Sequence, residues 1–205
     1  MAANDAIAGV GMCVVGKAMA EPIELHQFNV AWSGRYQDIA VLLRPALPKD
    51  AVLHHIGSTA IDGLSAKDII DIQVSVNALD DVDVAAMERN GFHFRPGLKD
   101  HCPAGMTLEP SELEKRFFNL AEPSANIHVR ERGRFNQRFS LVSRDYLRAC
   151  DEAAKAYEKI KIELSSRFPD DKTLYYAIKD PVFDVIYMAA EQWARVNDWV
   201  ESPSD

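Results

Sequence analysis

The segment that most constrains the fold runs from Ile69 to Val76 and reads IIDIQVSV. Side chains alternate across a β-strand, so Asp71, Gln73 and Ser75 share one face, and the other face is aliphatic, with Ile70, Ile72, Val74 and Val76. An unbroken row of aliphatic side chains is stable only when it is buried in a core. The segment therefore predicts an inner strand whose opposite face is polar.

Around this strand the sequence predicts an α+β fold, in which a mixed sheet of about five strands is covered by helices. Apolar residues at helical spacing predict helices within 29–47 and 81–90 and throughout the C-terminal third, which we expect to pack against the inner strand. Further strands are expected at 52–56, 92–95, 116–120 and 125–130, with a loop at 96–110. The Asp180–Pro181 step predicts the start of the last helix, as its cap and first-turn proline.

Charge and cysteine content exclude several classes of protein. The chain has 23 Lys and Arg against 31 Asp and Glu, a formal charge of −8, which argues against binding to duplex DNA because that relies on clustered cations. Three widely spaced cysteines form neither a disulfide framework nor a metal-ligand spacing and fit a cytoplasmic protein.

We expect no membrane association and three parts: a flexible N-terminal extension at 1–22, one domain at 23–196 and a C-terminal tail at 197–205.

The residues before the inner strand suggest a binding site. Gly57, Ser58 and Thr59 form a turn whose backbone N–H groups and hydroxyls are suited to phosphate, and Asp71 would stand beside it to hold Mg²⁺. The alternative interpretation is structural: Gly57 only makes a turn, the two hydroxyls cap the next segment, and Asp71 is solvated at a strand edge.

Several ordered motifs resemble the GrpB family. They are HIGSTAIDGLSAKDIIDIQVSV at 55–76, SRDYLRA at 143–149, YEKIK at 157–161, and Tyr176 with Lys179 ahead of a helix containing Trp193. The resemblance covers roughly 23–196. The family is similar in fold to the nucleotidyltransferases of the DNA polymerase β type, which carry a Gly-Ser turn followed by an Asp-x-Asp strand. The resemblance implies a nucleotide or another phosphorylated small molecule as ligand, with a nucleoside triphosphate and weakly bound Mg²⁺ as cofactors.

The resemblance also implies roles for single residues. Asp71 would hold the metal, and Gln73 stands in the second metal position, where a neutral amide is a weak ligand. His128, on the polar face of the strand at 125–130, is a candidate for metal binding or proton transfer. The phosphate-binding set would be Gly57, Ser58, Thr59, Lys67, Arg144 and Lys161, and Arg116, Arg138 and Lys179 are further cations that we place at the same cleft.

Two functions of different classes remain open at this point. The first is an enzyme that transfers a nucleotidyl group to an unknown acceptor, with Arg144 and Lys161 neutralising the developing charge. The second is a non-catalytic nucleotide-binding or accessory domain, as in GrpB-like domains fused to dephospho-coenzyme A kinases. Gln73 favours the second function because the metal-ligand set is depleted. The oligomeric state is not indicated by the sequence.

Overall fold

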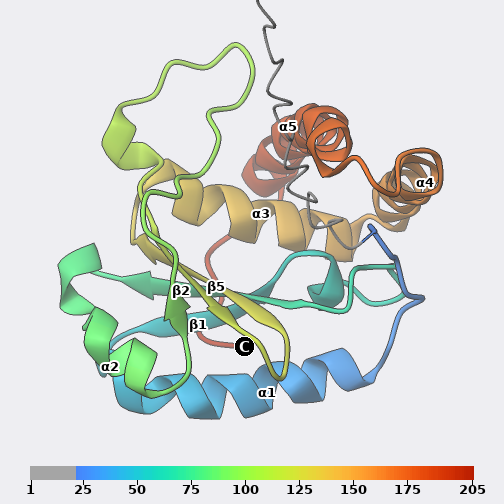
Figure 1. Cartoon of the computed structure of the whole chain (residues 1–205). Coiled ribbons are helices and arrows are strands. Elements are labelled where there is room, and N and C mark those ends of the chain that lie inside the picture. The colour runs from blue at the N-terminus through green and yellow to red at the C-terminus, as the bar shows by residue number, and fades with distance from the viewer. Residues whose placement is uncertain (1–21) are drawn as a thin grey trace, which may run out of the picture.

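The structure is a computed structural model that describes residues 22–205, so the extension expected at 1–22 lies, except for Pro22, outside the described residues. It consists of one mixed sheet with helices on both faces (Figure 1). The strands are β1 (Val52–Ile56), β2 (Ile70–Val76), β3 (His93–Phe94), β4 (Arg116–Leu120) and β5 (Ala125–Glu131). The α-helices are α1 (Ala31–Leu43), α2 (Val84–Arg89), α3 (Phe135–Ala149), α4 (Asp151–Arg167) and α5 (Lys172–Val196).

The sheet has the order β1-β2-β5-β4-β3, in which β2 and β5 are parallel and the other neighbours are antiparallel. The expected α+β class and the mixed five-stranded sheet are confirmed, and β2 is an inner strand as its alternation predicts. The register pairs Asp71 with Asn126 and Gln73 with His128, so the polar faces of β2 and β5 are continuous.

The two faces of the sheet are covered by different helices. The aliphatic row of β2 packs against α1, whose core residues are Trp32, Tyr36, Ile39 and Leu43. Helices α3, α4 and α5 lie on the opposite side of the sheet (Figure 1). The C-terminal helices therefore pack against the inner strand on its polar face, whereas α1 covers its apolar row. Gln73 and Ser75 are fully buried as a result, whereas Asp71 on the same face stays partly exposed.

The last helix does not begin at Asp180–Pro181. It begins at Lys172, and the side chain of Asp171 accepts a hydrogen bond from the backbone N–H of Leu174 at 2.9 Å as its N-cap. Pro181 lies inside α5. Proline in a helix removes one backbone hydrogen bond, so here tertiary packing of α5 against α3 and α4 overrides the local signal. The error matters because Tyr175, Tyr176 and Lys179 precede Pro181 on this helix.

The residues after α5, expected as a tail, return to the edge of the sheet at β1. The backbone N–H of Asp205 donates to the carbonyl oxygen of Leu53 at 3.2 Å, and the Asp205 carboxylate accepts from the backbone N–H of His55 at 2.9 Å. These bonds satisfy backbone groups of an edge strand. Within residues 22–205, none of the helices is both long and apolar enough to span a bilayer.

Candidate functional site

Gly57 shapes the turn between β1 and a short 3₁₀ helix (Ser58–Ala60). Its backbone has φ 72° and ψ −171°, a conformation that is essentially restricted to glycine. A Cβ atom at this position would lie 2.5 Å from Oδ2 of Asp71. The glycine therefore allows the turn to lie directly against the carboxylate of β2, which places Ser58 and Asp71 at one cavity.

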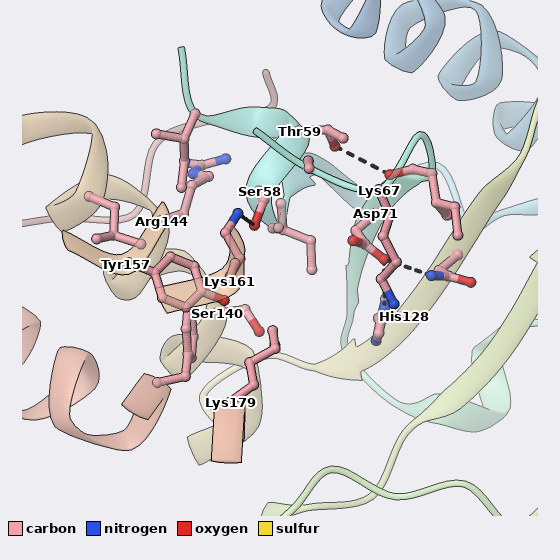
Figure 2. Close-up of a pocket in the computed structure, with 18 of the residues that line it drawn as sticks. Ser58, Thr59, Lys67, Asp71, His128, Ser140, Arg144, Tyr157, Lys161 and Lys179 are labelled. Atoms are coloured by element: carbon pink, nitrogen blue, oxygen red, sulfur yellow. Dashed lines mark hydrogen bonds and ion pairs between the residues drawn. The ribbon is translucent and has the colours of Figure 1, made fainter. Parts of the chain in front are cut away.

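That cavity has a volume of about 330 Å³, within the range of small-molecule sites. The sheet and the turn contribute one wall, and α3, α4 and α5 contribute the other (Figure 2). Eight of the nine sequence-predicted site residues line it: Gly57, Ser58, Thr59, Lys67, Asp71, His128, Arg144 and Lys161. The further candidate Lys179 also lines the cavity, whereas Arg116 and Arg138 are held outside it by Asp80 and Glu191, respectively.

Asp71 is the one carboxylate among the described residues that line the cavity. Its side chain is 31% exposed, and Oδ1 accepts a hydrogen bond from Nδ2 of Asn126 at 2.9 Å. Burial favours the protonated acid, but His128, Asn126 and the charge of Lys67 outweigh it and hold the pKa of Asp71 below its usual value. Asp71 is therefore ionised at neutral pH.

His128 is neutral, and its neighbours fix its tautomer. Lys115 Nζ lies 3.4 Å and an Arg130 guanidinium nitrogen 3.3 Å from Nδ1, and both groups only donate, so Nδ1 accepts. The proton is on Nε2, which faces Asp71 at 3.6 Å. Burial lowers the pKa of His128 to about 4, and the charges of Arg130 and Lys115 lower it further, whereas Asp71 raises it. Neither ring nitrogen is thus free to accept a proton or bind a metal without rearrangement.

Behind His128 lies an ion-pair network that sequence reasoning missed. Asp100, from the expected loop, bonds Arg130 at 2.8 Å and Lys115 at 2.6 Å. Arg130 also donates to Oε1 of Gln73 at 2.6 Å. Gln73 is fully buried and lies outside the cavity lining, so it would reach a metal at Asp71 only after a rearrangement. In residues 22–205 no cluster of three His, Cys, Asp or Glu side chains could hold a metal ion.

The metal implied by the resemblance fits this site only in part. Asp71 supplies one anionic oxygen ligand, and the other candidate ligands, Gln73 and His128, are engaged by cationic neighbours. Mg²⁺ commonly relies on substrate phosphates for its remaining ligands. Asp71 would therefore hold Mg²⁺ together with a phosphorylated ligand, where the ion would screen the charge of the phosphates.

Three lysine side chains end at the cavity, and the Nζ atom of each lies over an aromatic ring. The pairs are Lys67 over Tyr176 at 4.8 Å, Lys161 over Tyr157 at 4.9 Å and Lys179 over Phe183 at 5.6 Å. Lys161 Nζ also lies 2.9 Å from Ser58 Oγ and 2.6 Å from the carbonyl oxygen of Ser65. Figure 2 shows Lys161 pointing at Ser58, with Asp71 and His128 across the open space.

Arg144 borders the cavity, but its guanidinium is already engaged. It donates to Asp145 at 2.7 Å, to Asp205 at 2.5 Å and to the carbonyl oxygen of His55 at 3.0 Å. With only 3% of the residue exposed, Arg144 fastens α3 to β1 and to the C-terminal segment. A direct contact between Arg144 and a phosphate would require these buried ion pairs to open.

Comparison with known proteins identifies a matching family and several proteins of similar sequence. The profile of the family described as GrpB protein matches residues 22–189. A dephospho-CoA kinase from Mycolicibacterium paratuberculosis is 30% identical over an alignment of 200 residues that covers 87% of this chain and 48% of the kinase. A UPF0157 protein from Streptomyces coelicolor is 28% identical over 192 residues, covering 94% of this chain and 84% of that protein. The chain thus spans about half the length of the kinase it matches.

The fold also has a solved counterpart. The crystal structure of the conserved protein GrpB from Enterococcus faecalis superposes with a TM-score of 0.68 at 25% sequence identity. The similarity covers 83% of this chain and 99% of that one.

Proposed function

The chain belongs to the GrpB family, and on that premise we propose that its cavity binds the phosphate groups of a nucleotide or of another phosphorylated small molecule. The observation that carries the proposal is the charge of the cavity wall. Lys67, Lys179 and the partly protonated amine of Lys161 face a space whose one lining carboxylate, among the described residues, is Asp71. In a chain with net charge −8, such a local excess of cations favours an anionic ligand.

The aromatic rings support the same ligand class. The aromatic faces beside Lys67 and Lys179 do not neutralise their charge, and the Asp180 carboxylate pairs with Lys179 only at the longer distance of 3.9 Å. The rings of Tyr157, Tyr175 and Tyr176 also give the cavity an apolar side beside its cationic groups. A nucleotide combines an aromatic base with phosphates, and it matches both parts of this surface.

Nucleotidyl transfer is the reaction we propose for a nucleoside triphosphate in this cavity. Asp71 would share Mg²⁺ with the ligand phosphates, while Lys67 and Lys179 offset the charge that develops on the leaving pyrophosphate. The alternative is a binding or accessory domain without turnover. Its support is the engagement of Gln73 by Arg130, which takes the second candidate ligand away from a metal at Asp71.

Calorimetric titration of the full chain with ATP and with pyrophosphate, each with and without Mg²⁺, tests the binding proposal. We expect binding of both ligands, because both present adjacent phosphates. Lys67→Met should weaken ATP binding about 10-fold or more, since a hydrogen bond from a charged group contributes about 1.5–3 kcal/mol. Release of pyrophosphate from ATP would favour transfer, and binding without release would favour the accessory role.

Lys155→Met is the matched control, because Lys155 is an exposed lysine on α4. It removes the same charge from the chain but none from the cavity. If neither ligand binds, or if Lys67→Met binds ATP as Lys155→Met does, the phosphate-binding proposal is refuted.

A further inference from the structure

Ser58 and Lys161 form a hydroxyl–amine pair at the cavity wall. Lys161 Nζ lies 2.9 Å from Ser58 Oγ, within hydrogen-bonding distance, although 103 residues separate the two positions. The second contact of the amine, with the carbonyl oxygen of Ser65 at 2.6 Å, fixes its orientation. A neutral amine can donate to Ser65 and still accept the proton of the Ser58 hydroxyl through its lone pair.

The surroundings of Lys161 favour the neutral amine. Only 2% of the residue is exposed, and the ring of Tyr157 lies beneath Nζ. Burial lowers the pKa of Lys161 to about 7, and the charge of Lys179 on α5 lowers it further, whereas Glu158 opposes the change. The Glu158 carboxylate instead accepts a hydrogen bond from the backbone N–H of Ser65 at 2.6 Å. A large fraction of the amine is thus unprotonated near neutral pH.

The other hydroxyls at the cavity have different partners. Thr59 Oγ1 lies 3.0 Å from Nε2 of His55, which is buried between the sheet and α1. Ser140 Oγ accepts a hydrogen bond from Arg130 at 2.8 Å. A guanidinium keeps its proton and cannot act as a base. Among the described serines that line the cavity, Ser58 is the one with an amine in contact.

We propose that Ser58 is a nucleophile and Lys161 its general base, and that the pair attacks a phosphorus atom of a bound phosphoric anhydride. In this step a bond forms between Ser58 Oγ and phosphorus, and the bond from phosphorus to the bridging oxygen breaks. The Ser58 proton passes to Lys161, which returns it to the departing phosphate oxygen. Lys67 and Lys179 offset the negative charge around phosphorus. The substrate class rests on the proposed function, whereas the reactive pair rests on its own geometry.

A fluorophosphonate, in which fluoride is the leaving group, tests the pair without a nucleotide. We expect one adduct per chain by intact-mass analysis, mapped to Ser58 by peptide mass spectrometry. The unprotonated amine is the base, so the labelling rate should rise with pH and have its midpoint near pH 7. Ser58→Ala should give no adduct. Lys161→Arg, which keeps a cation but cannot accept a proton, should be labelled at least 10-fold more slowly.

Ser140→Ala is the control, because it removes a cavity hydroxyl that has no amine partner, and it should be labelled at the parental rate. Circular dichroism on each variant separates loss of fold from loss of reactivity. Three results would each overturn the assignment of Ser58 as nucleophile and Lys161 as base. They are the absence of an adduct on the folded parent, an adduct that persists in Ser58→Ala, and equal labelling rates for the parent and Lys161→Arg. Calorimetry with ATP reports separately on the proposed function: binding without labelling refutes only the pair, and labelling without binding refutes only the ligand class.

Discussion

Replacing Gly57 by alanine tests whether the turn is built around Asp71. Two separate costs arise. The first is backbone strain, because φ 72° with ψ −171° is sparsely populated by residues with a Cβ, at about 1–3 kcal/mol. The second is a collision, because the new Cβ would lie 2.5 Å from Oδ2 and 3.1 Å from Cβ of Asp71. The carboxylate must move, and its hydrogen bond from Asn126 is lost or weakened, at about 1.5–3 kcal/mol.

We therefore expect Gly57→Ala to reduce the free energy of unfolding by about 3–5 kcal/mol, measured by urea denaturation. Gly63→Ala is the matched control, because Gly63 also has a positive φ (77°) but its Cβ would meet no atom within 4 Å. It should show only the strain, about 1–3 kcal/mol.

A double-mutant cycle with Asp71→Ala isolates the collision, because this change removes Oδ2 and Cγ while the backbone strain at Gly57 remains. The cost of Gly57→Ala should fall by about 1.5–3 kcal/mol in the Asp71→Ala background. Two results would contradict this reasoning: an unchanged cost of Gly57→Ala in the Asp71→Ala background, or a cost of Gly57→Ala no larger than that of Gly63→Ala. Either would show that the Asp71 carboxylate is not the reason that position 57 requires glycine.

Three further changes probe the charges of the site. Asp71→Asn should leave the fold intact but abolish the synergy between nucleotide and Mg²⁺ in calorimetry; an unchanged Mg²⁺ dependence would show that Asp71 is not the metal ligand. Between about pH 7 and pH 10 the unfolded chain keeps the Lys161 proton that the folded chain has lost. The free energy of unfolding of the parent should therefore rise with pH relative to that of Lys161→Met, by at most about 1.4 kcal/mol per pH unit. Parallel curves of unfolding free energy against pH for the two proteins would contradict this. Asp100→Asn should destabilise by about 3–5 kcal/mol at neutral pH, because Arg130 and Lys115 lose their buried counter-charge. Arg130 and Lys115 outweigh burial and hold the pKa of Asp100 well below its usual value. The parent should therefore be more stable than Asp100→Asn above about pH 4, and this difference in unfolding free energy should disappear as acid protonates Asp100. A difference that persists in acid would count against this ion pairing.

Much of the fold follows from local sequence. The alternation of β2 identified the inner strand, because a two-residue period puts its aliphatic side chains on one face of the sheet, and that face must be buried. Gly57 marked the turn, since few other residues adopt its backbone conformation. Local signals failed at α5, where Asp180–Pro181 is a good helix start but long-range packing carries the helix through Pro181. They also could not assign the faces of the sheet, because which helix covers which face depends on the path of the whole chain.

The sequence by itself determined the strands, the turn and the types of residue that line the cavity. Only the tertiary structure decided their chemical states. His128 is neutral with its proton on Nε2 because Lys115 and Arg130 approach Nδ1, and Lys161 has a lowered pKa because α5 buries it beside Lys179. The physical reason is that backbone conformation depends on near neighbours in the chain. Protonation and pairing depend instead on charges and burial contributed by residues distant in sequence but adjacent in space.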